Sequence, residues 1–268
     1  MINLEDFCIY ISTSKSYEDL IPPMILLLTK YTNLNGLKTY IGSEEPSNLN
    51  SLLPETHLSI EIFHCIECGP WGKRTIENLK KVKEKYVLFI LDDFFLTNYI
   101  DFRIINQIIN FLNANSHVGF VKQTYRPKAD RDFLSKSDNF TVNFHPPAIW
   151  RKDFLIKILR KHESIWAFET MGAKRLRRWY KKNETWIVNR HFYNNLWLDG
   201  LSPVLSGRWL QDQKLFDFFE SERIHINYSV RGLKTRKEHF ETPKYHFFKR
   251  HKWFLIPLKI FNRFRSNF

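Results

Sequence analysis

Long hydrophobic runs and flexible segments are both scarce in this sequence of 268 residues. The longest apolar runs, Met24–Leu28, Val87–Leu91 and Trp253–Leu258, are far shorter than the ~20 residues that a membrane-spanning helix needs. The chain has 9 glycines, 11 prolines and no internal repeat, which argues against a disordered spacer. Glu5 and Asp6 stand where a secretory signal would carry basic residues. We therefore expect a globular, cytoplasmic protein that is either soluble or attached peripherally to the inner face of the cell membrane.

Cysteine is also rare, and the three present do not form a complete framework. Cys8, Cys65 and Cys68 are odd in number, which excludes full pairing into disulfides. Cys65 and Cys68 have the CxxC spacing, but no second such pair and no nearby histidine pair completes a zinc site. Cys8 and Cys65 lie in strand-like runs, where free cysteine usually packs as a small core residue. A reducing compartment fits these cysteines best.

Positive charge is abundant, with 41 lysines and arginines against 28 acidic residues and a net charge of +13. The last 25 residues hold seven of these cations and no acid, and a second basic cluster lies between Lys174 and Lys182. A field of this sign favours anionic partners, such as nucleic acid, phosphorylated metabolites or an acidic membrane face.

The first half of the sequence alternates between strand and helix patterns. Strands are expected at Phe7–Ile11, Leu37–Ile41, His57–Cys65, Val87–Leu91 and Val118–Val121, and helices at about 17–31, 73–86 and 100–112. The continuous apolar run at Val87–Leu91 indicates a strand that is covered on both faces, as in a parallel sheet. This alternation predicts an α/β fold with a mostly parallel sheet flanked by helices.

The pattern loosens beyond residue 125. Helices are expected at Arg151–Lys161, at about 170–182 and at Gln211–Ser221, and short strands at Trp186–Val188 and Ile224–Tyr228. We expect a single domain over residues 1–243, in which 1–125 and 126–243 form two halves, and a basic aromatic tail over 244–268.

Two adjacent carboxylates, Asp92 and Asp93, directly follow the buried strand at Val87–Leu91. Open α/β sheets place their ligands at the carboxyl ends of strands. Burying both carboxylates without a partner costs several kcal/mol, and Mg²⁺ or Mn²⁺, which prefer oxygen ligands, would supply that partner. From the two residues alone, a helix cap or a surface turn explains the pair equally well.

The surrounding sequence adds a family resemblance. Trp71-Gly72-Lys73-Arg74, a helix, and then Glu84-Lys85-Tyr86 leading through the apolar strand to Asp93 resemble the core of GT-A type glycosyltransferases. The resemblance is strongest to the large inverting family 2, which includes bacterial surface-polysaccharide enzymes, and covers about a quarter of the chain closely. It departs at Phe94, where a third acidic residue often stands in the family.

The resemblance implies a Rossmann-like GT-A fold and a metal-dependent, inverting glycosyltransferase. Such an enzyme moves a sugar from a nucleotide-sugar donor, here a UDP-sugar, to a glycan or lipid-linked acceptor in surface polysaccharide synthesis. The implied site residues are Asp93 as the ligand of Mn²⁺ or Mg²⁺, Asp92 facing the ribose or a bridging water, Thr13, Ser14 and Glu44 lining the nucleotide pocket, and Arg74 near the base or the diphosphate. The alternatives are a solvated helix residue for Arg74 and a polar turn for Glu44.

An inverting transfer also needs a carboxylate that takes the proton from the acceptor hydroxyl. The segments Pro147–Arg151 and Trp166–Glu169 occupy the place where the family carries its acceptor segment and an acidic pair, so the resemblance implies Glu169 as the catalytic base. A carboxylate that stabilises a helix N-terminus is the alternative. Trp150 and Trp166 would stack on sugar faces unless they belong to the core.

The tail over residues 244–268 interleaves aromatic residues with cations, which allows three interpretations. Cations near an anionic leaflet contribute about 1 kcal/mol each and Trp or Phe anchor at the interface, which favours a membrane contact. Basic and aromatic mixtures also bind single-stranded nucleic acid, or the tail packs on the domain or mediates oligomerisation. Besides the transferase, two functions stay open: a nucleic-acid-binding protein, for which no known binding motif is present, and a non-catalytic scaffold of the same fold.

Overall fold

The computed structural model describes residues 5–44, 49–65, 69–122, 134–137, 142, 144, 147–179, 185–188, 198 and 202–241. The chain divides into two compact units, Met1–Trp197 and Leu198–Phe268, and each is described by itself. The predicted boundaries after residues 125 and 243, and the predicted tail, lie outside the described residues.

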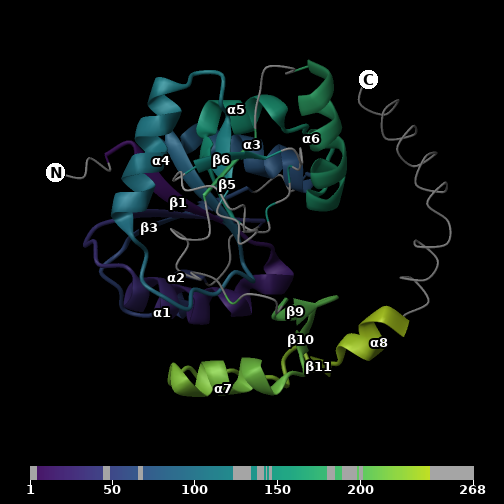
Figure 1. Ribbon diagram of the computed structural model, residues 1–268. Coiled ribbons are helices and arrows are strands. Elements are labelled where there is room, and N and C mark those ends of the chain that lie inside the picture. The colour runs from purple at the N-terminus through teal and green to yellow at the C-terminus, as the bar shows by residue number, and fades with distance from the viewer. Residues whose placement is uncertain are drawn as a thin grey trace. The chain divides into compact units, whose positions relative to one another are not determined.

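An eight-stranded sheet forms the centre of the first unit (Figure 1). Its strands are β1 (Phe7–Ser12), β2 (Lys38–Ser43), β3 (Ser59–His64), β4 (Tyr86–Leu91), β5 (Phe120–Lys122), β6 (Leu134–Ser137), β7 (Ala148–Arg151) and β8 (Thr185–Val188). They are ordered β3-β2-β1-β4-β7-β5-β8-β6. β7 pairs antiparallel with β4 and β5, β6 pairs antiparallel with β8, and every other pairing is parallel. The predicted α/β fold with a mostly parallel sheet is therefore confirmed.

The central strands β1 and β4 are apolar because helices cover both faces of the sheet. All residues of β1 and the first five of β4 are buried, as the continuous apolar runs predicted. In the parallel register, Ser12 at the end of β1 pairs with Gly42 of β2 on one side and with Leu91 of β4 on the other. The residues that follow these three strands consequently emerge at the same edge of the sheet.

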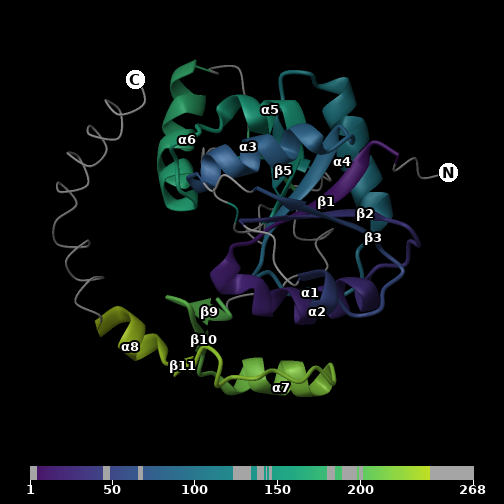
Figure 2. The ribbon, with the colours of Figure 1, turned by 180° about the vertical axis from the view of Figure 1, so that it is seen from behind.

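Two groups of helices pack on opposite sides of the sheet (Figures 1 and 2). One group holds α1 (Ile21–Tyr31), preceded by a 3₁₀ helix at Lys15–Leu20, and the short α2 (Leu49–Leu52). The other holds α3 (Trp71–Lys81), α5 (Lys152–Ile158) and α6 (Ile165–Trp179), which contact one another. The helix α4 (Phe102–Ala114) follows β4, and its N-cap residue is Asp101, whose side chain accepts a hydrogen bond from the Arg103 N–H.

Aromatic side chains fill the core between the sheet and the group of α3, α5 and α6. The rings of Phe89 and Phe144 stack with their centroids 4.5 Å apart, and those of Phe120 and Trp150 stack at 4.2 Å. Trp71 reaches this cluster from the start of α3 and packs edge-on against Phe144. Trp150 is fully buried and so belongs to the core rather than to a sugar-binding face.

The elements differ from the sequence expectations mainly at their boundaries. The helix expected over residues 73–86 ends at Lys81, because Val82 already has an extended backbone that leads into β4. The helix expected over about 170–182 begins at Ile165. The strand expected at Ile224–Tyr228 is wrong, since these residues form an irregular connection and a turn. The short antiparallel strand β7 was not predicted, because Pro147 and four non-alternating residues give no strand pattern.

The second unit is small and has its own core. β9 (Val204–Leu205), β10 (Arg208–Leu210) and β11 (Leu233–Lys234) form a three-stranded sheet that accompanies α7 (Gln213–Ser221) and α8 (Arg236–Glu241). Ser206 and Gly207 connect β9 to β10 with positive φ angles of 53° and 82°, the combination that a two-residue hairpin turn requires. The buried Trp209 ring packs edge-on against Phe219 and Tyr228. No described helix is long and apolar enough to cross a membrane.

The start of α3 is docked on the loop between α5 and α6 by main-chain hydrogen bonds. The Gly72 N–H donates to the Glu163 carbonyl at 2.8 Å, and the Lys73 N–H donates to the Lys161 carbonyl at 3.0 Å. Glu163 is itself held by a two-pronged ion pair with Arg175 of α6, with N–O distances of 2.5 and 2.7 Å. A Cβ atom at Gly72 would fall on the carbonyl oxygen of Arg160, so only glycine fits here.

Gly72→Ala should therefore destabilise the protein. The added methyl group meets backbone that cannot move aside, and overpacking of this kind costs about 1–3 kcal/mol. Gly69→Ala is the matched control, because the nearest atom to its Cβ belongs to the flexible side chain of Lys73, and its cost should stay within about 0.5 kcal/mol. Urea denaturation of both variants measures the difference, and equal stabilities would contradict the docking described here.

Candidate functional site

Five of the seven predicted site residues follow the carboxyl ends of neighbouring strands. Thr13 and Ser14 follow β1, Glu44 follows β2, and Asp92 and Asp93 follow β4. The parallel register aligns these strand ends, so the structure brings the five residues to one edge of the sheet. This is the edge at which open α/β sheets bind their ligands.

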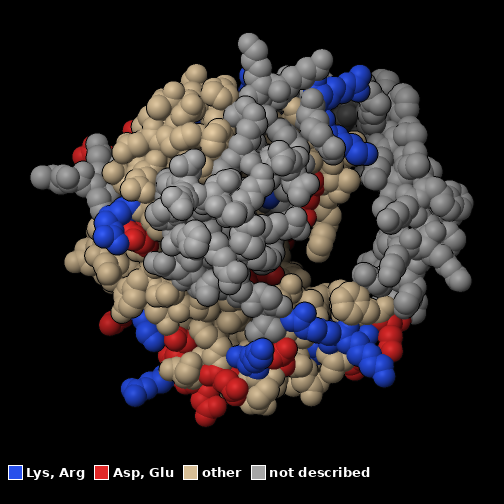
Figure 3. Space-filling model, in the orientation of Figure 1, with Lys and Arg blue, Asp and Glu red and all other residues tan. Residues whose placement is uncertain are grey.

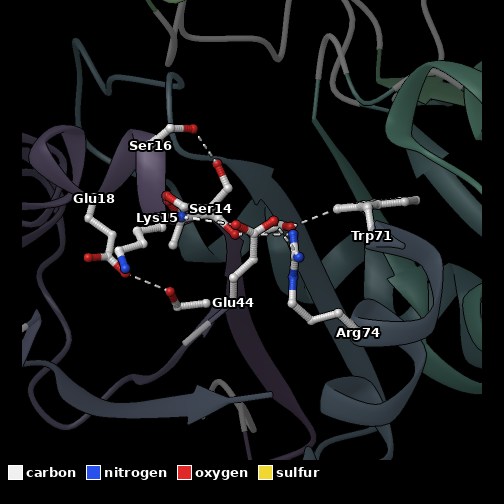
Figure 4. Close-up of polar contacts among 10 residues, drawn as sticks. Ser14, Lys15, Ser16, Glu18, Glu44, Trp71 and Arg74 are labelled. Atoms are coloured by element: carbon white, nitrogen blue, oxygen red, sulfur yellow. Dashed lines mark hydrogen bonds and ion pairs between the residues drawn. The ribbon is translucent and has the colours of Figure 1, made fainter. Parts of the chain in front are cut away.

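Arg74, the sixth residue, joins this edge from the first turn of α3 (Figure 4). Its Nη1 atom lies 2.6 Å from Oε1 of Glu44, and its Nη2 atom donates to the Thr13 carbonyl at 3.5 Å. The other Glu44 oxygen, Oε2, accepts from the Lys15 N–H at 3.4 Å. Arg74 is only 4% exposed, which rules out the interpretation as a solvated helix residue. The pair instead fixes the loop after β1 against the end of β2.

Further polar contacts, which the sequence did not reveal, hold the same loop in place. Trp71 Nε1–H donates to the Ser12 hydroxyl at 3.0 Å, and the Ser43 hydroxyl donates to Glu18 at 2.8 Å. The hydroxyls of Ser14 and Ser16 lie 3.1 Å apart (Figure 4). The Ser and Thr residues after these two strands, followed by Glu18 and Glu44, are the feature of the sequence that could have indicated this network. A loop bonded in this way presents its polar groups in a fixed geometry.

Asp92 and Asp93 form a turn at the end of β4, closed by a hydrogen bond from the Phe94 N–H to the Leu91 carbonyl at 3.2 Å. They do not cap the next helix, because Asp101 performs that role for α4. Both side chains are half-buried. Burial raises the pKa of the Asp93 carboxyl from its ordinary 3.8 to about 6.

The chemistry of this turn fits a small divalent cation. Among the described residues, no cationic side chain forms an ion pair with Asp93, so the desolvated carboxylate has no compensating positive charge there. The described residues also contain no cluster of three or more histidine, cysteine or acidic side chains. Mg²⁺ characteristically binds through one or two carboxylates and completes its shell with water and substrate phosphates. Asp92 and Asp93 match that donor set.

Glu169, the seventh predicted residue, lies in the second turn of α6 and not at its start. Its Oε1 atom accepts a hydrogen bond from the Phe144 N–H at 3.0 Å. Burial raises the pKa of Glu169, while this hydrogen bond and the positive charge of Lys122 oppose the shift. Lys122 is 4% exposed and ends β5, which runs in the same direction as β4. Lys122 and Glu169 therefore both lie toward the edge of the sheet that also carries Asp93, and the charge of the lysine lowers the pKa of the glutamate.

The chain matches no known family model and no curated protein. It resembles CMP:2-keto-3-deoxy-manno-octonic acid synthetase complexed with CTP, with a TM-score of 0.45 and 10% identity over 69% of this chain and 90% of that one. A cytidylyltransferase from Leptospira borgpetersenii gives a TM-score of 0.45 and 11% identity over 84% and 96% of the two chains. S. aureus TarS 1–349 gives 0.37 and 15%, and the match covers 69% of this chain and 60% of that one.

Replacing Asp93 should make the protein more stable at neutral pH. Because the folded-state pKa of about 6 lies above the ordinary 3.8, the folded state binds the proton more tightly. Wild-type stability should therefore fall as the pH rises from below 4 to above 6, by about 3 kcal/mol in total for a shift of this size. Asp93→Asn carries no charge and should escape this loss, which urea denaturation across the pH range measures in the absence of divalent cations.

Asp101→Asn provides the control of opposite sign. The hydrogen bond and charge of Arg103 lower the pKa of Asp101, so its ionised form stabilises the folded state. This variant should be less stable than wild type at neutral pH, and the gap should close as the pH falls below the ordinary pKa. A stability difference for Asp93→Asn that does not change with pH would contradict the burial of an ionisable Asp93.

Proposed function

We propose that this chain is a metal-dependent glycosyltransferase that moves a sugar from a nucleotide-sugar donor to a glycan or lipid-linked acceptor. The observation that carries the proposal is the convergence of three elements at one sheet edge: the loop fixed by Arg74 and Glu44, the turn of Asp92 and Asp93, and Glu169, which accepts a hydrogen bond from the Phe144 N–H. The first supplies polar groups for a nucleotide, the second a cation site and the third a candidate base.

The fixed loop supports nucleotide binding in a particular way. Arg74 pairs with Glu44 and also donates to the Thr13 carbonyl, so its main contribution would be to position Thr13, Ser14 and Glu44 rather than to bind phosphate. The Ser14 side chain, which is half-buried beside the exposed Lys15 and Ser16, would face the nucleoside. A loop that is ordered before binding avoids part of the entropy that ligand binding otherwise costs.

Asp93 and Asp92 would hold Mn²⁺ or Mg²⁺ at the diphosphate of the donor. A bound cation neutralises the charge that develops on a nucleoside diphosphate leaving group. The raised pKa of Asp93 is consistent with this role, because a desolvated carboxylate lacking a described cationic partner gains more from a cation than a solvated one. The donor would then lie across the ends of β1, β2 and β4.

Glu169 would act as the base of a single displacement. Its carboxylate takes the proton of the acceptor hydroxyl, the acceptor oxygen attacks the anomeric carbon, and the bond from that carbon to the diphosphate oxygen breaks. The products are the inverted glycoside, the nucleoside diphosphate and a protonated Glu169. Its raised pKa brings the carboxyl closer to the operating pH, where a general base is most effective.

A thermal-shift screen of uridine, cytidine, guanosine and thymidine diphosphate sugars, with and without Mn²⁺, tests donor binding. A donor at about 100 times its dissociation constant should stabilise the protein by ~2.7 kcal/mol. Mn²⁺ should increase the shift in wild type and leave it unchanged in Asp93→Asn. The exposed Lys214→Ala on α7 is the control and should behave like wild type. If no nucleotide sugar shifts the transition, the non-catalytic scaffold becomes the better explanation.

Glu169→Gln should slow transfer strongly while leaving the donor bound. The amide oxygen can still accept the hydrogen bond from the Phe144 N–H, so the fold is kept, but the side chain cannot take a proton. General base catalysis contributes 10²–10⁴-fold, and kcat should fall by about that factor with the donor thermal shift preserved. In wild type, kcat should decline as the pH falls through the raised pKa of Glu169, and the variant should lose this limb. Retention of full activity in the variant would exclude Glu169 as the base.

A further inference from the structure

The exposed side of α6 carries a ridge of four residues whose side chains do not enter the core. Trp166, Thr170, Lys174 and Arg178 are spaced four apart, which places them along one ridge of the helix. All four are exposed, and Trp166, at 79%, is the most exposed of the large hydrophobic side chains in the described part of the chain. Phe168 and Leu176 on the other side of the helix are fully buried. The ridge therefore faces away from the core.

The helix that carries this ridge is firmly held. Arg175 pairs with Glu163 through both terminal nitrogens, and its Nε–H donates to the Ile158 carbonyl at 3.0 Å. These bonds join α6 to the end of α5 and to the loop on which α3 is docked. Trp166 is therefore exposed on a helix that is held in place. A large apolar side chain in water contributes nothing to the stability of the fold.

The surroundings of the ridge are positively charged. Lys157 on α5 and Lys161 in the loop that leads to α6 are both exposed. Figure 3 shows lysine and arginine side chains over α6 at the upper right of the view. The α6 ridge thus combines one exposed tryptophan with a set of cations on long aliphatic stems.

We propose that the α6 ridge binds an anionic lipid surface. Cations near such a surface are attracted to lipid phosphates, and a tryptophan inserts at the level of the headgroups. Twelve residues of helix separate Trp166 from Arg178, so the ridge is about 18 Å long and can lie flat in the interface. Single-stranded nucleic acid needs a series of aromatic side chains on which successive bases stack, whereas the ridge offers one.

This surface is separate from the candidate site. Glu169 points from α6 toward Phe144, away from the ridge. Trp166, which the sequence made a candidate for stacking on a sugar, is exposed and not part of the core, and the proposal assigns it to the ridge instead. Vesicle binding and nucleotide binding can therefore succeed or fail independently, and the proposal stands without the transferase activity.

Co-sedimentation of the full chain with vesicles tests the proposal, with phosphatidylglycerol mixed into phosphatidylcholine and with phosphatidylcholine alone. Lys174→Ala combined with Arg178→Ala should weaken binding to the anionic vesicles about 30-fold, from about 1 kcal/mol for each cation near the surface. Lys30→Ala combined with Lys38→Ala is the control of equal charge change, since both residues are exposed on other elements of the same unit. This control should change binding less than 3-fold.

Trp166→Ala tests the apolar half of the ridge. It should weaken binding to anionic vesicles by a factor that persists at high salt, while the effect of the lysine and arginine substitutions disappears there. Equal losses for the two double variants, or none for either, would overturn the proposal, because binding would then depend on net charge or on other parts of the chain. A single-stranded oligonucleotide that binds more tightly than the vesicles, with no effect of Trp166→Ala, would assign the face to nucleic acid instead.

Discussion

The parallel register of β2, β1 and β4 is the constraint on which the candidate site depends. Ser12 pairs with both Gly42 and Leu91, so three loops that are distant in sequence begin at the same height above the sheet. A shift of one residue would turn every side chain of a strand to the opposite face. Because the faces of β1 and β4 are both buried, the register is set by tight packing, as at Gly42, where a Cβ atom would collide with the Tyr10 hydroxyl.

The charged residues near this edge differ in how far an opposite charge compensates each of them. Arg74 and Glu44 neutralise each other, and Arg175 and Glu163 do the same where α3 is docked. Lys122 only partly offsets the burial of Glu169, and no described cation offsets that of Asp93. The two ion pairs fix the backbone. Groups whose pKa is shifted by burial, in contrast, are commonly found at binding and catalytic sites. At this edge the paired charges therefore have a structural role, and Glu169 and Asp93 are the candidates for a functional one.

The sequence predicted the first half of the fold well and the second half poorly, for a physical reason. Strands β1 and β4 are covered on both faces and read as continuous apolar runs, and α3 and α4 have clear periodicity with a solvated face. β7 is four residues long and pairs with strands far away in the sequence, so no local pattern marks it. Glu169 was assigned by resemblance to a position before a helix, but Ile165 already starts that helix. The contacts of Arg74 could not be predicted, since only the fold brings Glu44 within reach.

The position of Glu169 on α6 has a geometric consequence for any lipid-linked acceptor. One helix carries a candidate base on its inner side and the α6 ridge on its outer side, and the Glu163–Arg175 pair holds it as a rigid piece. A surface bound at the ridge would then fix the direction from which the site is approached. An acceptor confined to that surface would reach the site by diffusion in two dimensions. Its orientation relative to the site would then already be restricted by the surface.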